Sequence, residues 1–351
     1  MFKRLILFSS LLLLLFATAC GGGSESASPS NSNTDEGNGN QEATYNFTYA
    51  HAGATTHTTH LAAQKFADLV EEKSNGRIQI TIYPNRQLGD EREIMENVIN
   101  GTIDMASNST PILTTVAPAL EVLQLPFLLN TYDIEQQAYQ TDAMKQLLDS
   151  VGQSIGVKLM GPHDLGMRHI ANNVREVKTP EDLSGLKLRT VQSPIMTDIF
   201  QTLGASPTPM AYGEVYTALQ TGTIDGEEIN LTSIVAEKHL EVLKYVTLTG
   251  QFPFPAVVLI NEAKYNQLSD ADKQILEEAA AEMQAFMFEE IKKIDADALE
   301  QIKAANVQVT ELTEEELEAF IRKTEPLVEK YMDKDPLIAD FVNAVRELKG
   351  Q

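Results

Sequence analysis

The chain has 351 residues, of which 50 are acidic and 27 basic, so its formal net charge at pH 7 is −23. This acidic excess argues against nucleic-acid binding, which depends on basic patches. Any anion that the protein binds must therefore be held by local positive groups that act against the overall field.

The N-terminus predicts export and lipid anchoring. Two basic residues precede an apolar run, Leu5 to Phe16, that has the length of a signal peptide and is too short to span a bilayer. Cys20 is the only cysteine of the chain, so it has no partner for an internal disulfide. We therefore expect a lipoprotein signal peptide over residues 1–19 and a lipid on Cys20, although Ala17 stands where such signals more often have Leu. Ordinary secretion with cleavage after Ala19 and a free thiol is the alternative.

The next segment has the composition of a tether. Residues 21–43 are rich in Gly, Ser, Asn and acidic residues and contain no Leu, Ile, Val, Phe, Lys or Arg. Such a segment buries too little apolar surface to offset its ordering entropy. We expect residues 20–43 to be a lipidated cysteine and a disordered tether between the membrane and a folded part. That folded part, from about Thr44 to Gln351, is long enough for two domains.

The first part of the folded region has an α/β pattern. Alternating apolar residues predict strands at 45–49 and 78–82, with an amphipathic helix between them. Asp90 begins a second helix, and Glu93 completes a capping box with it. Residues 103–106 then predict a short third strand. Strand–helix–strand–helix–strand is the pattern of a parallel α/β sheet.

The pattern returns later in the chain. A strand is predicted at 186–189, and the sequence Gly-Thr-Ile-Asp at 101–104 recurs at 222–225, each time directly after a helix. This repeated motif predicts two similar lobes. From Asp270 to about Ala304 the chain contains neither Gly nor Pro, which predicts one helix long enough to pack along both lobes.

Ligands of open parallel sheets bind beyond the carboxyl ends of the strands. Arg189 is the most informative residue at such a place, because its planar fork matches a carboxylate and stays charged when desolvated. Arg168 lies between two segments expected to be buried. A structural salt bridge or a solvated strand end is the alternative for each arginine. The strand-end rule nominates His51, Ser107, Asn108, the stretch 189–192 and the stretch 227–230.

Three stretches carry motifs of a known family. They are KTPEDLSGLKLR at 178–189, LGASPTPM at 203–210 and GEVYTALQTGTIDG at 213–226. Shorter matches lie at 83–90 and 125–127. Together they resemble the dicarboxylate-binding (DctP) solute-binding proteins of tripartite ATP-independent periplasmic (TRAP) transporters, over nearly the whole exported part.

The resemblance implies a two-lobed α/β fold of the periplasmic-binding-protein type II kind. Two parallel or mixed sheets are flanked by helices, and a long C-terminal helix spans both lobes. We expect one lobe from residues 44–166 plus about 255–294, and the other from 167–254 plus about 295–351. It also implies closure of the lobes on a small organic acid, which is handed to TRAP membrane subunits.

The resemblance also assigns roles to single residues. In the family, the arginine at the Arg189 position clamps the carboxylate, the arginine at Arg168 assists, and the aromatic residue at Tyr212 packs on the ligand. Gln192 and Gln251 fall near positions where the family presents polar groups.

One family motif departs from the pattern. The family sequence Asp-Gly-x-Glu-Asn-Pro reads Asp-Gly-Glu-Glu-Ile-Asn at 225–230. Glu228 matches the family Glu and is a candidate acceptor for a hydrogen bond from a ligand hydroxyl or from the partner arginine. Ile229 stands where the family has the Asn that assists the carboxylate, so Asn230 takes that role only if the loop shifts by one residue.

The opposite lobe is expected to recognise hydroxyl groups of the ligand. Ser107 and Asn108 are short and neutral, which favours a hydroxy acid or sugar acid over a solute with a second bulky anionic group. The residues expected to read hydroxyls are His51, Asp90, Ser107 and Asn108.

An enzyme is one alternative. The chain has no nucleophile elbow, glycine-rich phosphate fingerprint or Walker loop. The neighbouring pairs His163–Asp164 and Glu227–Glu228 are candidates for acid–base chemistry, but solvated side chains explain adjacent residues equally well. We therefore expect a binding protein without catalytic residues or cofactors.

A metal-binding protein is another alternative. His51, His57 and His60 cluster in the sequence, and a zinc site needs three or four convergent ligands. Polar residues at a strand end and a helix start explain the cluster without a metal, and we expect none. A sensor subunit that reports the same ligand to a membrane partner is a third alternative, which the sequence does not separate from transport.

Overall fold

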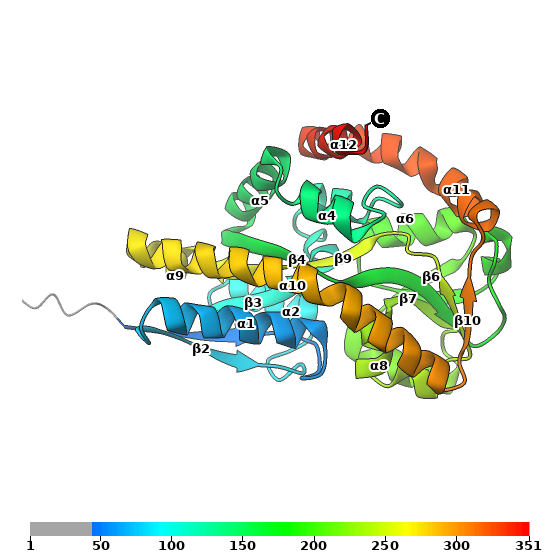
Figure 1. Ribbon diagram of the computed structural model, residues 1–351, viewed down its shortest axis with the longest axis horizontal. Coiled ribbons are helices and arrows are strands. Elements are labelled where there is room, and N and C mark those ends of the chain that lie inside the picture. The colour runs from blue at the N-terminus through cyan, green and yellow to red at the C-terminus, as the bar shows by residue number, and fades with distance from the viewer. Residues whose placement is uncertain (1–43, 351) are drawn as a thin grey trace, which may run out of the picture. The chain divides into compact units, whose positions relative to one another are not determined.

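The computed structural model describes residues 44–350, whose strands form two sheets joined by one long strand (Figure 1). The first sheet has the order β2-β1-β3-β9-β4. β1 pairs in parallel with β2 and β3, whereas β9 is antiparallel to β3 and β4. Its strands are β1 (Tyr45–Ala50), β2 (Ile78–Tyr83), β3 (Met105–Ser109), β4 (Val157–Asn172) and β9 (Pro253–Asn261).

The second sheet has the order β6-β5-β7-β4, with β8 also paired to β4 and β10 paired to β8. β5 is parallel to β6 and β7, and β10 is parallel to β8. β7 and β8 are antiparallel to β4. The strands not yet given are β5 (Lys187–Thr190), β6 (Ser206–Pro209), β7 (Gly226–Asn230), β8 (Tyr245–Leu248) and β10 (Gln308–Glu311).

The strand β4 has 16 residues and passes from one sheet into the other. It pairs with β9 as far as Met167 and with β7 from Arg168 onward. Its register shifts twice before the crossing, and Gly166 there has a φ of 119°, which favours glycine. A Cβ at Gly166 would also lie 2.9 Å from a carboxylate oxygen of Asp295. The crossing therefore requires glycine at this position.

The long helix α10 ties two hydrophobic cores together. It has 35 residues and packs against α1, β4 and α8 (Figure 1). Leu276 and Met283 belong to a core with α1, whereas Ala298 and Ile302 belong to a core with α7 and α8. The expected α/β fold with a long C-terminal helix is thus confirmed. These helices are α1 (Thr58–Lys73), α7 (Val215–Thr221), α8 (Leu231–Ala236) and α10 (Asp270–Ala304).

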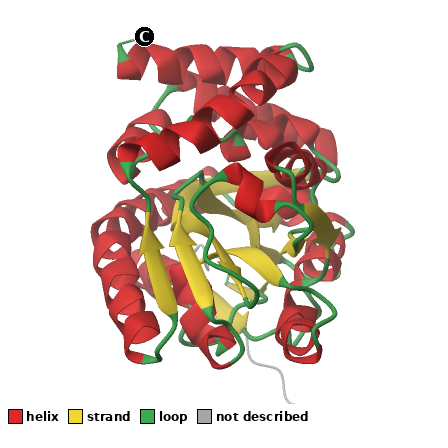
Figure 2. Cartoon of the chain, turned by 90° about the vertical axis from the view of Figure 1, so that its right-hand side faces the viewer, coloured by secondary structure: helices red, strands yellow, loops and turns green. Residues whose placement is uncertain are grey.

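A third core lies beneath helices that include the C-terminal pair (Figures 1 and 2). α11 packs on α6, and α12 packs on α4, α5 and η1, which come from the segment 44–166. Residues 44–350 belong to one compact unit, so the division into lobes stays a prediction. The helices here are α2 (Glu91–Ile99), α3 (Thr110–Leu113), η1 (Pro118–Gln124), α4 (Tyr132–Ala138), α5 (Asp142–Ile155), α6 (Pro194–Leu203), α11 (Glu314–Met332) and α12 (Pro336–Lys349).

Four short helices complete the described residues, in which no helix combines the length and apolar character needed to cross a membrane. They are η2 (Pro180–Leu183), η3 (Tyr212–Glu214), η4 (His239–Glu241) and α9 (Glu262–Asn266).

The predicted elements agree with the structure in order, but β3 begins at Met105 and not at residue 103, and β5 begins at Lys187 and not at residue 186. Each copy of Gly-Thr-Ile-Asp forms a turn, and β3 and β7 begin directly after it, at Met105 and Gly226. Ile103 and Ile224 are buried in these turns, and a buried isoleucine in a turn has the same sequence pattern as one in a strand. Ser107, Asn108 and residues 227–230 therefore lie within strands and not beyond their ends.

Three carboxyl groups are buried where α4, β4 and α10 meet. Asp164 accepts hydrogen bonds from two backbone N–H groups at 3.0 and 3.1 Å, and the Tyr132 hydroxyl donates to Asp295. Burial raises the pKa of Asp164 to about 6 and that of Asp295 to about 7. Burial also raises the pKa of Glu135 well above its usual value, and the nearby Asp164 raises it further. The fold thus favours the protonated form of these groups.

Replacing Asp295 by Asn is expected to change how stability depends on pH. A carboxyl group with a higher pKa in the folded state stabilises the fold fully below its unfolded pKa, and it loses that contribution as pH rises through the folded pKa. Asp295 has a folded pKa of about 7, so wild type should lose this contribution between about pH 4 and 7. Asp295→Asn should therefore gain stability relative to wild type over this range, on the order of 1–3 kcal/mol.

Melting temperatures measured across this pH range test the expectation. Asp297→Asn is the matched control, because Asp297 is exposed on the same helix. Its difference from wild type should stay nearly constant with pH. A constant difference for Asp295→Asn as well would contradict the raised pKa.

Candidate functional site

Two adjoining cavities form the candidate site. They contain about 410 and 570 Å³ of space outside the protein atoms, counting the part open to solvent. Both are lined by Glu91, Arg189, Val191 and Tyr212. The first is also lined by Ala52, Gly53, His57, Thr59, Leu165, Arg168, Ser233 and Phe254, and the second by Asp90, Arg92, Glu93, Ile112, Gln192, Met210 and Ala211.

Arg189 lies on β5 and borders both cavities. Its side chain is buried, and its Nε and one terminal nitrogen donate to the Met210 carbonyl at 3.2 and 3.0 Å. Its guanidinium lies 6.0 Å from the centre of the Tyr212 ring. Within residues 44–350, Arg189 forms no ion pair with an acidic side chain. A buried guanidinium without a counterion is suited to hold an anionic ligand.

Arg168 also borders the first cavity, but its charge is already compensated. Its Nε donates to the Glu228 carboxylate at 2.6 Å, and another nitrogen donates to the Glu228 carbonyl at 2.6 Å. The other Glu228 oxygen accepts from the Val191 N–H at 3.1 Å. The Arg168 guanidinium lies 4.0 Å from the centre of the Phe254 ring. Burial lowers the pKa of Arg168, and Glu228 opposes this effect.

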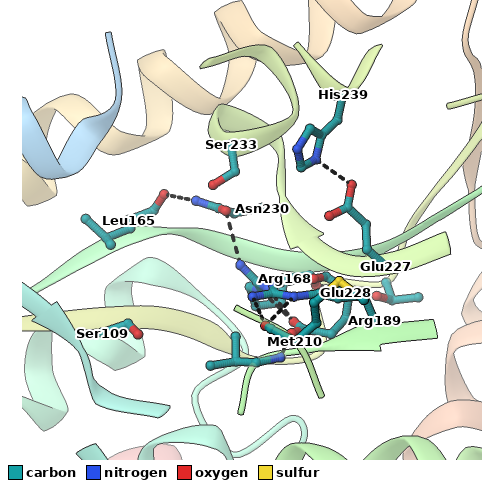
Figure 3. A network of polar contacts seen from close by, with 12 residues as sticks. Ser109, Leu165, Arg168, Arg189, Met210, Glu227, Glu228, Asn230, Ser233 and His239 are labelled. Atoms are coloured by element: carbon teal, nitrogen blue, oxygen red, sulfur yellow. Dashed lines mark hydrogen bonds and ion pairs between the residues drawn. The ribbon is translucent and has the colours of Figure 1, made fainter. Parts of the chain in front are cut away.

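Asn230 lies between Leu165 and Arg168 and contacts both (Figure 3). Its Oδ1 accepts from Arg168 at 3.2 Å, and its Nδ2 donates to the Leu165 carbonyl and to the Thr232 hydroxyl. All three nitrogens of the Arg168 guanidinium thus contact groups within the protein. Glu228 and Asn230 are fully buried and line neither cavity.

His57 is a cavity residue that sequence reasoning did not assign to the ligand site. It is the N-cap of α1, and its Nδ1 accepts from the Thr59 N–H at 3.1 Å. Its proton therefore lies on Nε2, which donates to the Ser233 hydroxyl at 2.9 Å. Burial lowers the pKa of His57 to about 4, and Arg168 and Arg86 add to this effect. His57 is thus neutral at pH 7.

Glu91 is a second cavity residue that sequence reasoning missed. It is the first residue of α2, and its carboxylate accepts from the Ser109 N–H at 3.2 Å and the Ser109 hydroxyl at 2.8 Å. Burial raises the pKa of Glu91, whereas the Ser109 hydrogen bonds and the charge of Arg189 oppose that rise. Both missed residues lie at helix N-termini, whereas the strand-end rule searches only the carboxyl ends of strands.

The structure brings some of the predicted residues to the cavities. Arg189 and Tyr212 line both, Arg168 lines the first, and Asp90 and Gln192 line the second.

Other predicted residues lie behind the cavity walls. His51, Ser107, Asn108 and Gln251 are buried and line neither cavity. Asn108 donates to the Glu91 carbonyl at 2.8 Å, and the Gln251 backbone pairs with that of Arg168. Asn108 and Gln251 therefore contact residues that do line the cavities.

Hydrogen bonds connect the two sides of the cavities. Asp90 accepts from the Gly213 N–H at 2.9 Å, and Arg92 donates to Gln192 at 3.2 Å. Outside the cavities, Arg86 pairs with Glu237 at 2.9 Å. The segment that follows β2 of the first sheet thus contacts the segments that follow β5 and β6 of the second sheet directly.

The geometry does not favour catalysis by the pair of neighbouring glutamates. Glu227 and Glu228 point to opposite faces of β7, because successive side chains of a strand alternate. Glu227 contacts His239 at 2.8 Å, whereas Glu228 turns toward Arg168 (Figure 3).

The other pair, His163 and Asp164, is likewise engaged with separate partners. His163 Nδ1 contacts the Gly161 carbonyl at 2.8 Å, and Asp164 accepts from the Gly166 and Phe254 N–H groups.

The histidine cluster does not converge on one point. His51 contacts His60 at 3.0 Å, whereas His57 is engaged by Thr59 and Ser233. In the described part of the chain, no group of three or more His, Cys, Asp or Glu side chains is arranged to hold a metal ion.

Most of the chain matches the model of one known protein family. The model of the bacterial extracellular solute-binding protein family 7, DctP, matches residues 49–335. This chain belongs to that family. The resemblance to TRAP solute-binding proteins is therefore confirmed, and the DctP chain is a non-enzymatic component of transport on the extracytoplasmic side of the membrane.

Relatives of this DctP chain include proteins with named ligands. The chain is 32% identical over 302 residues to the 2,3-diketo-L-gulonate-binding periplasmic protein YiaO of Escherichia coli (strain K12), covering 84% of this chain and 89% of the relative. Its fold is similar to that of the sugar acid binding protein DctPAm from Advenella mimigardefordensis strain DPN7T in complex with galactonate, with 29% identity, a TM-score of 0.82 and coverage of 87% and 99%. It is also similar to a TRAP periplasmic solute binding protein from Polaromonas sp. JS666 bound to D-erythronate, with 28% identity, a TM-score of 0.81 and coverage of 86% and 98%.

Arg168→Ala is expected to destabilise the protein by about 3–5 kcal/mol, because it leaves the buried Glu228 charge without a partner. Urea unfolding followed by circular dichroism measures the loss. Adding Glu228→Gln to this variant should recover part of the stability, since it removes the unpaired charge. Wild-type stability of the single variant would contradict the assignment of the ion pair as structural.

Proposed function

We propose that this chain captures a small carboxylate-bearing solute and delivers it to the membrane subunits of a TRAP transporter. The solute is a sugar acid, a hydroxy acid or a dicarboxylate. The observation that carries the proposal is Arg189, a buried guanidinium that borders both cavities and has no acidic partner within residues 44–350. The sugar acids held by the similar proteins described above are in keeping with it.

The charges around the first cavity support binding of an anion. Arg168 and Glu228 compensate one another, and His57 is neutral because its pKa is about 4. Arg189 therefore remains as the cation available to the solute carboxylate, and Arg168 assists it. Each charge-assisted hydrogen bond of this kind contributes about 1.5–3 kcal/mol. Tyr212 covers an apolar part of the solute.

The placement of these groups supports closure of two lobes on the solute. Arg189 and Tyr212 come from the second sheet and its helices, whereas Glu91 and Thr59 come from α2 and α1 beside the first sheet. A solute that touches both sets binds the closed form better than an open one and so shifts the population toward it. The contacts of His57 with Ser233 and of Asp90 with Gly213 are then formed on closure.

Loss of the Arg189 charge is expected to abolish solute binding. We would screen residues 44–351 by thermal shift against dicarboxylates, 2-oxo acids, uronates, aldonates, sialate and zinc. A ligand present at about 100 times its dissociation constant adds about 2.7 kcal/mol of stability. At least one acid should raise the melting temperature of wild type, and Arg189→Gln should remove that shift.

Arg175→Gln is the matched control for this variant. Arg175 is exposed, and it lines neither cavity, so its loss should leave the shift intact. Undiminished acid binding by Arg189→Gln would overturn the arginine clamp, and a shift caused by zinc alone would favour the histidine cluster.

Anchoring through Cys20 completes the proposal, although Cys20 lies outside the described residues. In cells that produce the full chain, wild-type protein should fractionate with membranes, because a lipid-modified cysteine partitions into the bilayer. Cys20→Ala should not receive the lipid and should be lost from the membrane fraction. Immunoblots of membrane and soluble fractions measure this. Equal membrane association of the two proteins would contradict lipid anchoring at Cys20.

A further inference from the structure

We propose that Glu91 is the specificity-determining residue of the site and restricts it to polyhydroxy monocarboxylic acids. Glu91 would accept hydrogen bonds from solute hydroxyl groups and repel a second carboxylate. The inference rests on the proposed function, since it takes the Arg189 side of the cavity as the position of the solute carboxylate.

The position of Glu91 relative to Arg189 supports this role. Both residues line both cavities, yet no ion pair joins them. A solute can therefore lie between them, with its carboxylate on Arg189 and its carbon chain directed toward Glu91. Glu91 is held in place by the N–H and the hydroxyl of Ser109. These two donors occupy part of the carboxylate and leave lone pairs for hydroxyl groups of the solute, because an ionised carboxylate has about four acceptor sites.

The local charges make a second carboxylate unfavourable in the first cavity. Two guanidinium groups line it, and Glu228 compensates that of Arg168. A monoanion compensates Arg189. A second negative group on the same solute would meet Glu91 and would find no other cation in the lining of this cavity. A hydroxyl group in its place is neutral and donates a proton to the Glu91 carboxylate.

Among the described residues that line the cavities, Arg92 is the cation that could hold a second carboxylate of the solute instead. It lines the second cavity, where it donates to Gln192 at 3.2 Å. A dicarboxylate that reached from Arg189 to Arg92 would bind across the second cavity. Asp90, Glu91 and Glu93 line that cavity too, so acidic groups surround Arg92 and oppose this arrangement.

Matched pairs of acids test the inference, because each pair differs only in one terminal group. The pairs are D-galactonate with galactarate, D-gluconate with D-glucarate, L-threonate with L-tartrate, and D-erythronate with meso-tartrate. Isothermal titration of residues 44–351 gives the ratio of dissociation constants within each pair. For the pair that binds, wild type should prefer the monoacid by roughly 100-fold, since like charges brought together cost several kcal/mol.

Glu91→Gln should reduce this preference by about tenfold or more, because the amide keeps the shape of the side chain and removes its charge. Glu96→Gln is the control, since Glu96 is exposed on the same helix outside both cavities, and it should keep the wild-type ratio. Ser109→Ala removes one hydrogen bond to Glu91 and keeps its charge. Its affinities should fall, while the preference for the monoacid persists.

Three results would overturn the inference. Wild type that binds a diacid as tightly as its monoacid partner would do so, as would an unchanged ratio in Glu91→Gln. Loss of diacid binding in Arg92→Gln alone would assign the solute to the second cavity instead. Failure of the proposed function is distinct, because then no acid binds wild type, or acids bind Arg189→Gln as well as wild type.

Discussion

The ion pair between Arg168 and Glu228 sets the electrostatic character of the cleft. It forms where β4 leaves β9 and joins β7, so the strand that connects the two sheets also supplies one of the two arginines that line the first cavity. Glu228 and Asn230 accept hydrogen bonds from Arg168, and Glu228 neutralises its charge. The second arginine of the first cavity, Arg189, is therefore the one whose charge remains for a ligand. An acidic protein thereby presents a local positive group to an anion without exposing that group to bulk solvent.

The same strand and the helix α10 connect the parts of the fold around the site. α10 contributes apolar residues to one core beside α1 and to another beside α8, and β4 belongs to both sheets. β4 itself contributes Leu165 and Arg168 to the lining of the first cavity.

Much of the fold could be predicted from the sequence, because its signals were local. Alternating apolar residues located β1 and β2, and the stretch from Asp270 to Ala304 predicted α10 with correct ends. Contacts between distant residues had no local signal. A salt bridge at Arg168 and an acceptor role for Glu228 were among the alternatives that the sequence left open, but no local signal chose between them. Nor does any local signal show that Asn230 lies in β7 or that Glu91 enters the cavity from a helix N-terminus. The family resemblance located Arg189 and Tyr212, which both line the cavities, while their roles toward a ligand stay predictions.

A crystal structure of residues 44–351 with the acid that stabilises the protein most would test the central claim directly. The account predicts that the solute carboxylate accepts hydrogen bonds from Arg189 at about 2.7–2.9 Å, while Arg168 keeps its contacts with Glu228 and Asn230. A carboxylate bound elsewhere, with Arg189 still donating only to the Met210 carbonyl, would contradict it.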